Sequence, residues 1–328
     1  MSEPSHPETV SQPEVVERVL ALKSLELFAH LEPAELTPLA DRLERVEVAS
    51  AERLLREDEP VAFVIFVLEG ILHERRHGAR LREVGPRDAV GLADLLAGTR
   101  GGVEVSSTRH SMALRASRET LLAAMEDSFP IQQAILRALG RAALDAASTL
   151  GSEPPMASRP SPQHGAGAEP DLAERIAVLR RTPLLRAVRV HTLGQLALDA
   201  TGLPLERGEV LWRRGDSADH AVLLLQGRVG LQAEPHPDLE AGGGQLLGLE
   251  ECLAERPRER EAVVRESGAA LRLQIESLLD ALEDDPDVSL DLMTALAVEV
   301  TARLDRLAAQ RGAGGVREQS AREPGRRP

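Results

Sequence analysis

Reactive side chains in this sequence do not fall into the spacings that catalytic or metal sites need. The chain has no His-Glu-x-x-His, Gly-x-Ser-x-Gly or Cys-x-x-Cys motif, and its nine histidines show no zinc-site spacing. The acidic run Asp284, Asp285 and Asp287 lacks the glycine and the terminal glutamate of a calcium loop. The single cysteine, Cys252, excludes an intramolecular disulfide, and we interpret it as a small buried hydrophobe. We therefore expect a protein that is not an enzyme and holds no metal.

The charge and hydropathy of the chain disfavour some classes of binding partner. The 328 residues carry a formal net charge of -14, which repels phosphate backbones unless a local basic face overrides it. The first residues, MSEPSHPETV, are acidic and bear prolines, unlike a signal peptide. The longest apolar run, 61–68, is far shorter than the roughly 20 residues of a membrane helix. The sequence thus predicts a cytoplasmic protein with no DNA partner and no membrane partner.

The elements that must position any site occur in two copies. Matching residues stand 157 positions apart: Leu54 and Leu211, Arg56 and Arg213, Gly70 and Gly227, Gly91 and Gly248, Leu139 and Leu296. Repeats of this size are whole domains, because solenoid and propeller repeats run to roughly 20 to 50 residues. The chain is therefore interpreted as a duplicated domain.

Composition predicts where the two domains begin and end. Polar segments rich in proline, glycine or serine at 1–13, 151–170 and 309–328 are expected to be a disordered N-terminus, a linker and a disordered tail. These segments leave a first domain at 14–150 and a second domain at 171–308.

Within each copy the expected order is short helices, then strands, then a long helix. The apolar runs AFVIFVLEG and HAVLLLQG each end in glycine and favour buried strands. His77-Gly78 and the run 242–244 predict turns. The last helix of each copy carries an apolar stripe, formed by Ile131, Ile135, Leu139, Ala142, Ala146 and Leu150 and by Met293, Leu296, Val300, Leu304 and Leu307.

The stripe within Val288–Leu307 must be buried, and the sequence leaves open what covers it. One alternative is a homodimer in which two copies of this helix pair. The others are packing against helix 131–150 of the same chain or against the domain's own sheet. We favour a helix pair, within or between chains, because the stripe is longer than a small sheet covers.

The second copy contains the segment GEVLWRRGDSADHAVLLLQGRVGLQ, residues 208–232. Its pattern resembles the opening of a cyclic nucleotide-binding domain, on Gly208, Glu209, Leu211, Gly215, Asp216, Leu225 and Gly227. The first copy keeps a weaker version on Ala51, Glu52, Leu54, Asp58, Glu59, Leu68 and Gly70. The resemblance implies an α+β protein with two tandem cyclic-nucleotide-binding-like domains, each an eight-stranded β-roll (a double-stranded β-helix, or jelly roll) flanked by helices.

The same resemblance points to candidate ligand residues, and both copies depart from the family there. Family members that bind nucleotide have Gly-Glu opening a short helix and an arginine about ten residues later. The carboxylate accepts the ribose hydroxyl, while the arginine and the helix N–H groups hold the cyclic phosphate. The matching positions are Gly91, Leu92 and Gly101 (with Arg100 beside it) in the first copy, and Gly248, Leu249 and Arg258 in the second.

Neither copy keeps the ribose acceptor. We interpret Leu92 and Leu249 as core residues that close an unused pocket, and Arg258 as a solvated residue paired with Glu255 or Glu261. Residues 250–261 hold five carboxylates against three arginines, a poor local trap for an anion.

These observations favour a regulatory or scaffold protein with degenerate sites that acts through an unidentified protein partner. The alternative is a second-messenger sensor that binds a cyclic nucleotide in the second domain, the only cofactor considered. The 21 residues after Leu307 are too few for the winged helix that follows this domain in many bacterial regulators, so we expect no DNA-reading domain.

Overall fold

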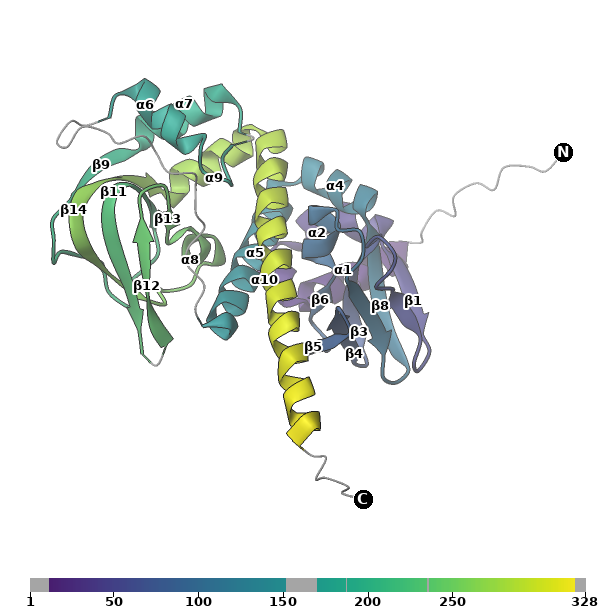
Figure 1. Cartoon of the computed structure of the whole chain (residues 1–328). Coiled ribbons are helices and arrows are strands. Elements are labelled where there is room, and N and C mark those ends of the chain that lie inside the picture. Colours follow the sequence, from purple (N-terminus) through teal and green to yellow (C-terminus); the bar gives the residue numbers. More distant parts are fainter. Residues whose placement is uncertain (1–11, 152–169, 187, 235, 322–328) are drawn as a thin grey trace, which may run out of the picture. The chain divides into compact units, whose positions relative to one another are not determined.

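The structure, a computed structural model, describes residues 12–151, 170–186, 188–234 and 236–321 (Figure 1). It divides the chain into two compact units, Met1–Ala134 and Ile135–Pro328. The segments predicted as a disordered N-terminus and linker lie almost wholly outside the described residues. No helix of the described part is long and apolar enough to cross a bilayer.

Unit 1 begins with short helices and continues into two antiparallel sheets. Its elements are α1 (Gln12–Ser24), η1 (Glu26–Phe28), α2 (Pro33–Arg42), β1 (Glu44–Val48), β2 (Arg53–Leu55), β3 (Phe63–Glu69), β4 (Leu72–Arg76), β5 (Ala79–Val84), β6 (Ala89–Val90), α3 (Leu92–Ala97), β7 (Val103–Ser107), β8 (Ser111–Ser117), α4 (Arg118–Asp127) and α5 (Phe129–Leu150). The sheet orders are β1-β8-β3-β6 and β2-β7-β4-β5. The predicted mixture of helices and antiparallel sheet is confirmed.

The expected turn at His77-Gly78 joins β4 to β5. Arg76 pairs with Ala79, so the loop has two residues, and both have positive φ, +48° at His77 and +75° at Gly78. Positive φ at both central positions gives the turn a twist that matches the twist of the strands.

Unit 2 contains the second half of α5 and all later elements. These are α6 (Leu172–Leu179), α7 (Val190–Asp199), β9 (Thr201–Leu205), β10 (Val210–Trp212), β11 (His220–Ala233), β12 (His236–Gly242), β13 (Leu246–Leu247), α8 (Leu249–Ala254), β14 (Glu261–Gln274), α9 (Ile275–Asp284) and α10 (Pro286–Ala321). The sheet order is β10-β14-β11-β12, with β9 on β14 and β13 on β11. Valine and leucine side chains of β11 pack in the core of this sheet with valine and alanine side chains of β14.

The elements of unit 2 follow those of unit 1 at the offset seen in the sequence. The start of β1 at Glu44 and that of β9 at Thr201 are 157 residues apart, and so are the starts of α5 at Phe129 and α10 at Pro286. One difference concerns the long strands. β11 covers the positions of β3 and β4 together, and its register shifts around Gly227, whose φ is +91°.

Two predicted boundaries differ from the bounds of the units and helices in the structure. The first domain was expected to end at 150, but the division falls within α5, and Ile135–Leu150 pack with the second unit. The tail was expected from 309, but α10 continues to Ala321. The alanine, glutamine, arginine and glutamate residues of 308–321 are good helix formers, and they outweigh the three glycines of this stretch.

Candidate ligand cavity in the second unit

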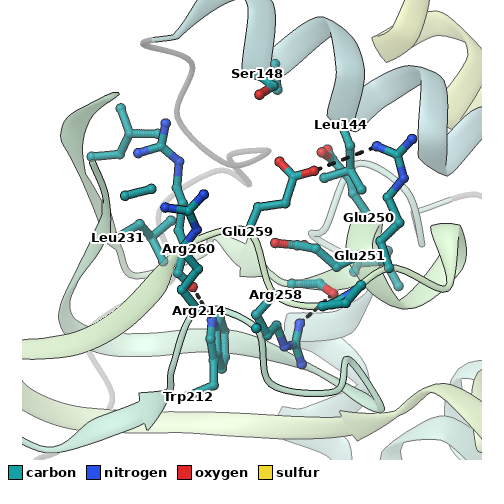
Figure 2. Close-up of a pocket in the computed structure, with 18 of the residues that line it drawn as sticks. Leu144, Ser148, Trp212, Arg214, Leu231, Glu250, Glu251, Arg258, Glu259 and Arg260 are labelled. Carbon is teal, nitrogen blue, oxygen red and sulfur yellow. Dashed lines mark hydrogen bonds and ion pairs between the residues drawn. The ribbon is translucent and has the colours of Figure 1, made fainter. Parts of the chain in front are cut away.

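The cavity around the candidate residues lies in unit 2, beside α8 (Figure 2). Its volume is about 500 Å³, which falls in the range of small-molecule sites, roughly 300 to 1,000 Å³. Gly248, Leu249 and Arg258 all line it. The other lining residues that matter below are Leu144, Ala147, Ser148, Trp212, Arg214, Leu231, Glu250, Glu251, Glu259, Arg260 and Arg303.

Arg258 is buried rather than solvated, so its predicted surface ion pair with Glu255 or Glu261 is wrong. Its side chain is 1% exposed. Nη1 donates to the Gly248 carbonyl at 2.9 Å, and Nη2 donates to the His220 carbonyl. The guanidinium lies 4.3 Å from the centre of the Trp212 ring, a distance at which the ring face attracts a cation.

The backbone explains why Arg258 points inward. Its N–H donates to the Asp216 carbonyl at 2.9 Å, and its carbonyl accepts from the Gly215 N–H at 2.9 Å. These bonds attach the segment after α8 to the loop after β10. The resemblance had selected Gly215 and Asp216 without showing this role.

The buried position of the Arg258 guanidinium requires a glycine at position 248. Gly248 has φ +77°, and a Cβ there would lie 2.1 Å from Nη1 of Arg258. Only glycine leaves room for the guanidinium. The two nitrogens that would hold a phosphate in the family pattern are thus already bonded within the protein.

Leu249 is buried, as predicted, but it lines the cavity of about 500 Å³ and so does not close the pocket. The next residue, Glu250, accepts from both Nη atoms of Arg303 at 2.7 and 2.8 Å. Arg303 comes from α10, and its Nη1 also donates to the Ala143 carbonyl of α5 at 2.8 Å. Sequence reasoning missed Arg303 because it lies 53 residues from Glu250, and no local pattern marked it.

Two further carboxylates in the cavity were also missed. Figure 2 shows the Glu251 and Glu259 side chains reaching into the space below Leu144 and Ser148. Burial raises the pKa of both carboxyl groups. The acidic balance of 250–261 was the only sequence signal for them.

The second half of α5 lines part of the cavity. Leu144, Ala147 and Ser148 line it, and α5 packs so tightly on α8 that a Cβ at Gly140 would lie 2.9 Å from the Ala254 nitrogen. Arg256 pairs with Asp145 at 2.6 Å across the same contact. A ligand in this cavity would therefore touch the second half of α5.

The matching positions in unit 1 do not form such a site. Leu92, which was predicted to be a core residue, is only half-buried, and Arg100 is exposed. Gly101 has φ +103°, and a Cβ there would lie 2.4 Å from the Glu57 carbonyl, so no arginine fits at this position. The Gly91 that precedes α3 has φ +88°.

An internal ion pair holds α3 in unit 1. Arg76 of β4 donates through Nη2 to both carboxylate oxygens of Asp94 at 2.6 Å, and both side chains are buried. This pair satisfies a charge on α3 within the protein, much as Arg258 is satisfied in unit 2.

Cys252 is buried, and burial raises the pKa of its thiol to about 11. The side chain is therefore a neutral thiol at pH 7, which agrees with its interpretation as a small hydrophobe. No cluster of histidine, cysteine, aspartate or glutamate among the described residues is arranged to hold a metal ion.

Comparison with known proteins identifies one domain. Residues 203–285 match the family model of the cyclic nucleotide-binding domain. This match confirms the resemblance for the second copy. No curated relative matches the chain.

Several solved structures are similar to this chain. The cAMP-bound regulatory domain of Toxoplasma gondii PKA is 16% identical with a TM-score of 0.32, covering 85% of this chain and 98% of that one. The regulatory subunit of a cAMP-independent protein kinase A from Trypanosoma brucei is 18% identical with a TM-score of 0.32, covering 85% and 89%. The N-terminal domain of a transcriptional regulator from Streptomyces coelicolor is 24% identical with a TM-score of 0.36, covering 40% and 94%.

Proposed function

We infer that this chain is a cytoplasmic, non-enzymatic regulatory protein with two tandem cyclic-nucleotide-binding-like domains whose nucleotide sites are degenerate. It acts by contact with another protein, and neither duplex DNA nor a membrane is its partner. The shared order of elements at an offset of 157 residues supports the tandem arrangement. The formal net charge of -14 disfavours nucleic acid.

The bonded state of Arg258 carries this proposal. To hold a cyclic phosphate, its guanidinium would have to leave the Gly248 and His220 carbonyls and the Trp212 ring. Hydrogen bonds to a charged group are worth about 1.5 to 3 kcal/mol each. The ribose hydroxyl would also lack a carboxylate at position 249, where the side chain is leucine. These losses together weaken binding by several orders of magnitude at about 1.4 kcal/mol per tenfold.

Thermal unfolding with cyclic AMP and cyclic GMP at millimolar concentration tests the proposal. A ligand at 100 times its dissociation constant stabilises the folded state by about 2.7 kcal/mol, and we expect no such shift. The Leu249→Glu variant restores the missing carboxylate and should still show no shift, because Arg258 stays bonded. A saturable shift in the unmodified protein would contradict the proposal.

A second candidate function is sensing of a small molecule by unit 2. The observation that favours it is the cavity of about 500 Å³, which lies beside α8 although the phosphate position is filled by protein bonds. Residues of α5 and α10 line it, so an occupant would contact the last helix of each copy. The cyclic nucleotide of the sequence-based alternative is one such occupant.

A further inference from the structure

Three charged groups of the cavity in unit 2 make no salt bridge. Glu251, Arg214 and Arg260 form no ion pair with any residue that the structure describes. Arg214 donates to the Glu234 carbonyl at 3.2 Å and Arg260 to the Pro237 carbonyl at 2.9 Å, so each guanidinium is held at the cavity wall by a backbone oxygen. The cavity therefore offers charged groups that make no direct ion pair among the described residues, although Arg258 acts electrostatically on Glu251.

The opposite charges come from different elements. Glu251 comes from the first turn of α8, whereas Arg214 follows β10 and Arg260 precedes β14. The Glu251 and Glu259 carboxylates both act on the Arg260 guanidinium electrostatically, and burial lowers the pKa of that guanidinium. Glu251 and Arg260 therefore interact electrostatically across the cavity, although they form no ion pair.

Neither a simple anion nor a simple cation matches this arrangement. An anion bound at the arginines would lie near the Glu251 and Glu259 carboxylates, and a cation bound at those carboxylates would lie near the Arg260 guanidinium. Glu251 and Arg260 are half-buried and Arg214 is exposed, and a charge that is removed from water is costly unless it is paired. Apolar walls at Leu144 and Leu231 complete the cavity.

We propose that this cavity binds a small zwitterion, a molecule that carries a protonated amine and a carboxylate on a compact apolar body. The amine pairs with Glu251, assisted by Glu259, and the carboxylate pairs with Arg260, assisted by Arg214. The apolar body packs against Leu144 and Leu231. This inference rests on the ligand-sensing alternative above and needs no contribution from Arg258 to the ligand.

Calorimetric titration of the full chain with matched probes tests this assignment. L-phenylalanine carries both charged groups, 2-phenylethylamine only the amine and 3-phenylpropionate only the acid. L-leucine, 3-methylbutylamine and 4-methylpentanoate form the aliphatic set. We expect saturable binding of at least one amino acid, with each of its single-charge analogues weaker by about tenfold or more, since each forfeits one charge-assisted pair. No saturation by either amino acid, or equal affinity for an analogue, would overturn the proposal.

Two variants test which cavity residue pairs with each charged group of the ligand. Glu251→Gln should weaken the amino acid about tenfold and leave the acid-only probe unchanged, whereas Arg260→Gln should weaken the amino acid and leave the amine-only probe unchanged. Glu240→Gln changes an exposed carboxylate of β12 that pairs with Arg228, outside the cavity, and is the matched control. If Glu251→Gln fails to fold, Glu251→Asp keeps the charge but shortens the reach, and it should weaken the same probe.

A parallel titration with cyclic AMP separates this inference from the proposed function. Saturation by cyclic AMP contradicts the degenerate-site proposal whatever the amino acids do. Saturation by an amino acid that is insensitive to both Glu251→Gln and Arg260→Gln overturns the zwitterion assignment alone.

Discussion

Arg258 stabilises unit 2 because its buried charge is hydrogen-bonded to two backbone carbonyls and faces an indole ring. Arg258→Ala should therefore lower the free energy of unfolding by about 3 kcal/mol, from lost charge-assisted bonds and the cation–π contact. Urea unfolding measures this loss. Arg256→Ala is the control, since its pair with Asp145 is part-exposed and such pairs are worth less than about 1 kcal/mol. Equal losses in the two variants would show that Arg258 is not the anchor described.

The Arg76 and Asp94 pair makes a similar prediction for unit 1. Asp94→Ala removes the carboxylate from a guanidinium that is 1% exposed, which should cost about 3 to 5 kcal/mol. Replacing both residues, Arg76→Met with Asp94→Leu, should recover most of that loss, because apolar side chains of similar size need no partner. Urea unfolding of the two variants checks this. A double variant as unstable as the single one would refute the ion-pair explanation.

His220 predicts how pH affects unit 2. Burial lowers the pKa of its imidazole, and Arg258 and Arg272 act in the same direction, while Asp219 opposes them. The folded state therefore binds this proton less readily than the unfolded state does. The stability that neutral His220 contributes is present above its unfolded pKa of about 6.5 and is lost as the pH falls from that value through the lower pKa of the folded state. Unfolding at about pH 7.5 and pH 5.5 should show a larger loss in the unmodified protein than in His220→Gln. An identical loss in both would exclude this role.

At the scale of residues, the sequence indicated which positions line the site more accurately than it indicated the contacts that those side chains make. Gly248, Leu249 and Arg258 were found because their spacing is local. The bonds that decide their role are not local, since Arg258 donates to a carbonyl 38 residues away. The Arg76 and Asp94 pair had no sequence signal, because an acid and a base 18 residues apart are common on a surface.

At the scale of elements, the order of helices and strands followed from apolar runs and from Gly turns. The boundaries between consecutive strands did not follow from these local patterns. β11 continues through Gly227 as one strand, whereas the equivalent Gly70 separates β3 from β4. Both glycines have positive φ, so the difference comes from the pairing of neighbouring strands, which a single segment does not encode.

The contact between α5 and α8 depends on a glycine within a helix. Gly140→Ala raises helix propensity, yet its Cβ would meet the Ala254 nitrogen at 2.9 Å and the Leu253 Cβ at 3.1 Å. We expect a net loss of about 1 to 3 kcal/mol, as for other overpacked sites. Gly194→Ala on α7 is the matched control, because its Cβ would meet only the Ile176 Cδ1, at 4.0 Å. That variant should gain about 0.5 to 1 kcal/mol. Melting temperatures of the two variants should therefore shift in opposite directions, and a stabilising Gly140→Ala would refute the tight contact.

At the scale of the whole molecule, the offset of 157 residues was readable from the sequence, and it recurs in the starting positions of matching elements. The division between units was not. Composition marked 151–170 as the boundary, but compactness places Ile135–Leu150 with unit 2. The sequence of α5 does not indicate that its second half packs within unit 2. An apolar stripe indicates that a helix face is buried, but it does not indicate which partner covers that face.

The apolar stripe of α10 gives a prediction about association. Met293, Leu296 and Val300 are fully buried within one chain, and Arg303 on the same helix donates to the Ala143 carbonyl of α5. This burial favours the intrachain helix pair over a homodimer through Val288–Leu307. Light scattering should therefore give the monomer mass of 35.4 kDa.

Two substitutions on this helix separate the alternatives. Val300 is 0% exposed and Val298 is 50% exposed. Val300→Asp buries an unpaired charge and should cost several kcal/mol of stability, at least about 3, whereas Val298→Asp should change stability by less than about 0.5 kcal/mol. Neither should alter the mass of the folded protein. A dimer in the unmodified protein that Val298→Asp dissociates would contradict the expected monomer. It would show that the exposed side of α10 joins two chains even though the stripe is buried within one chain.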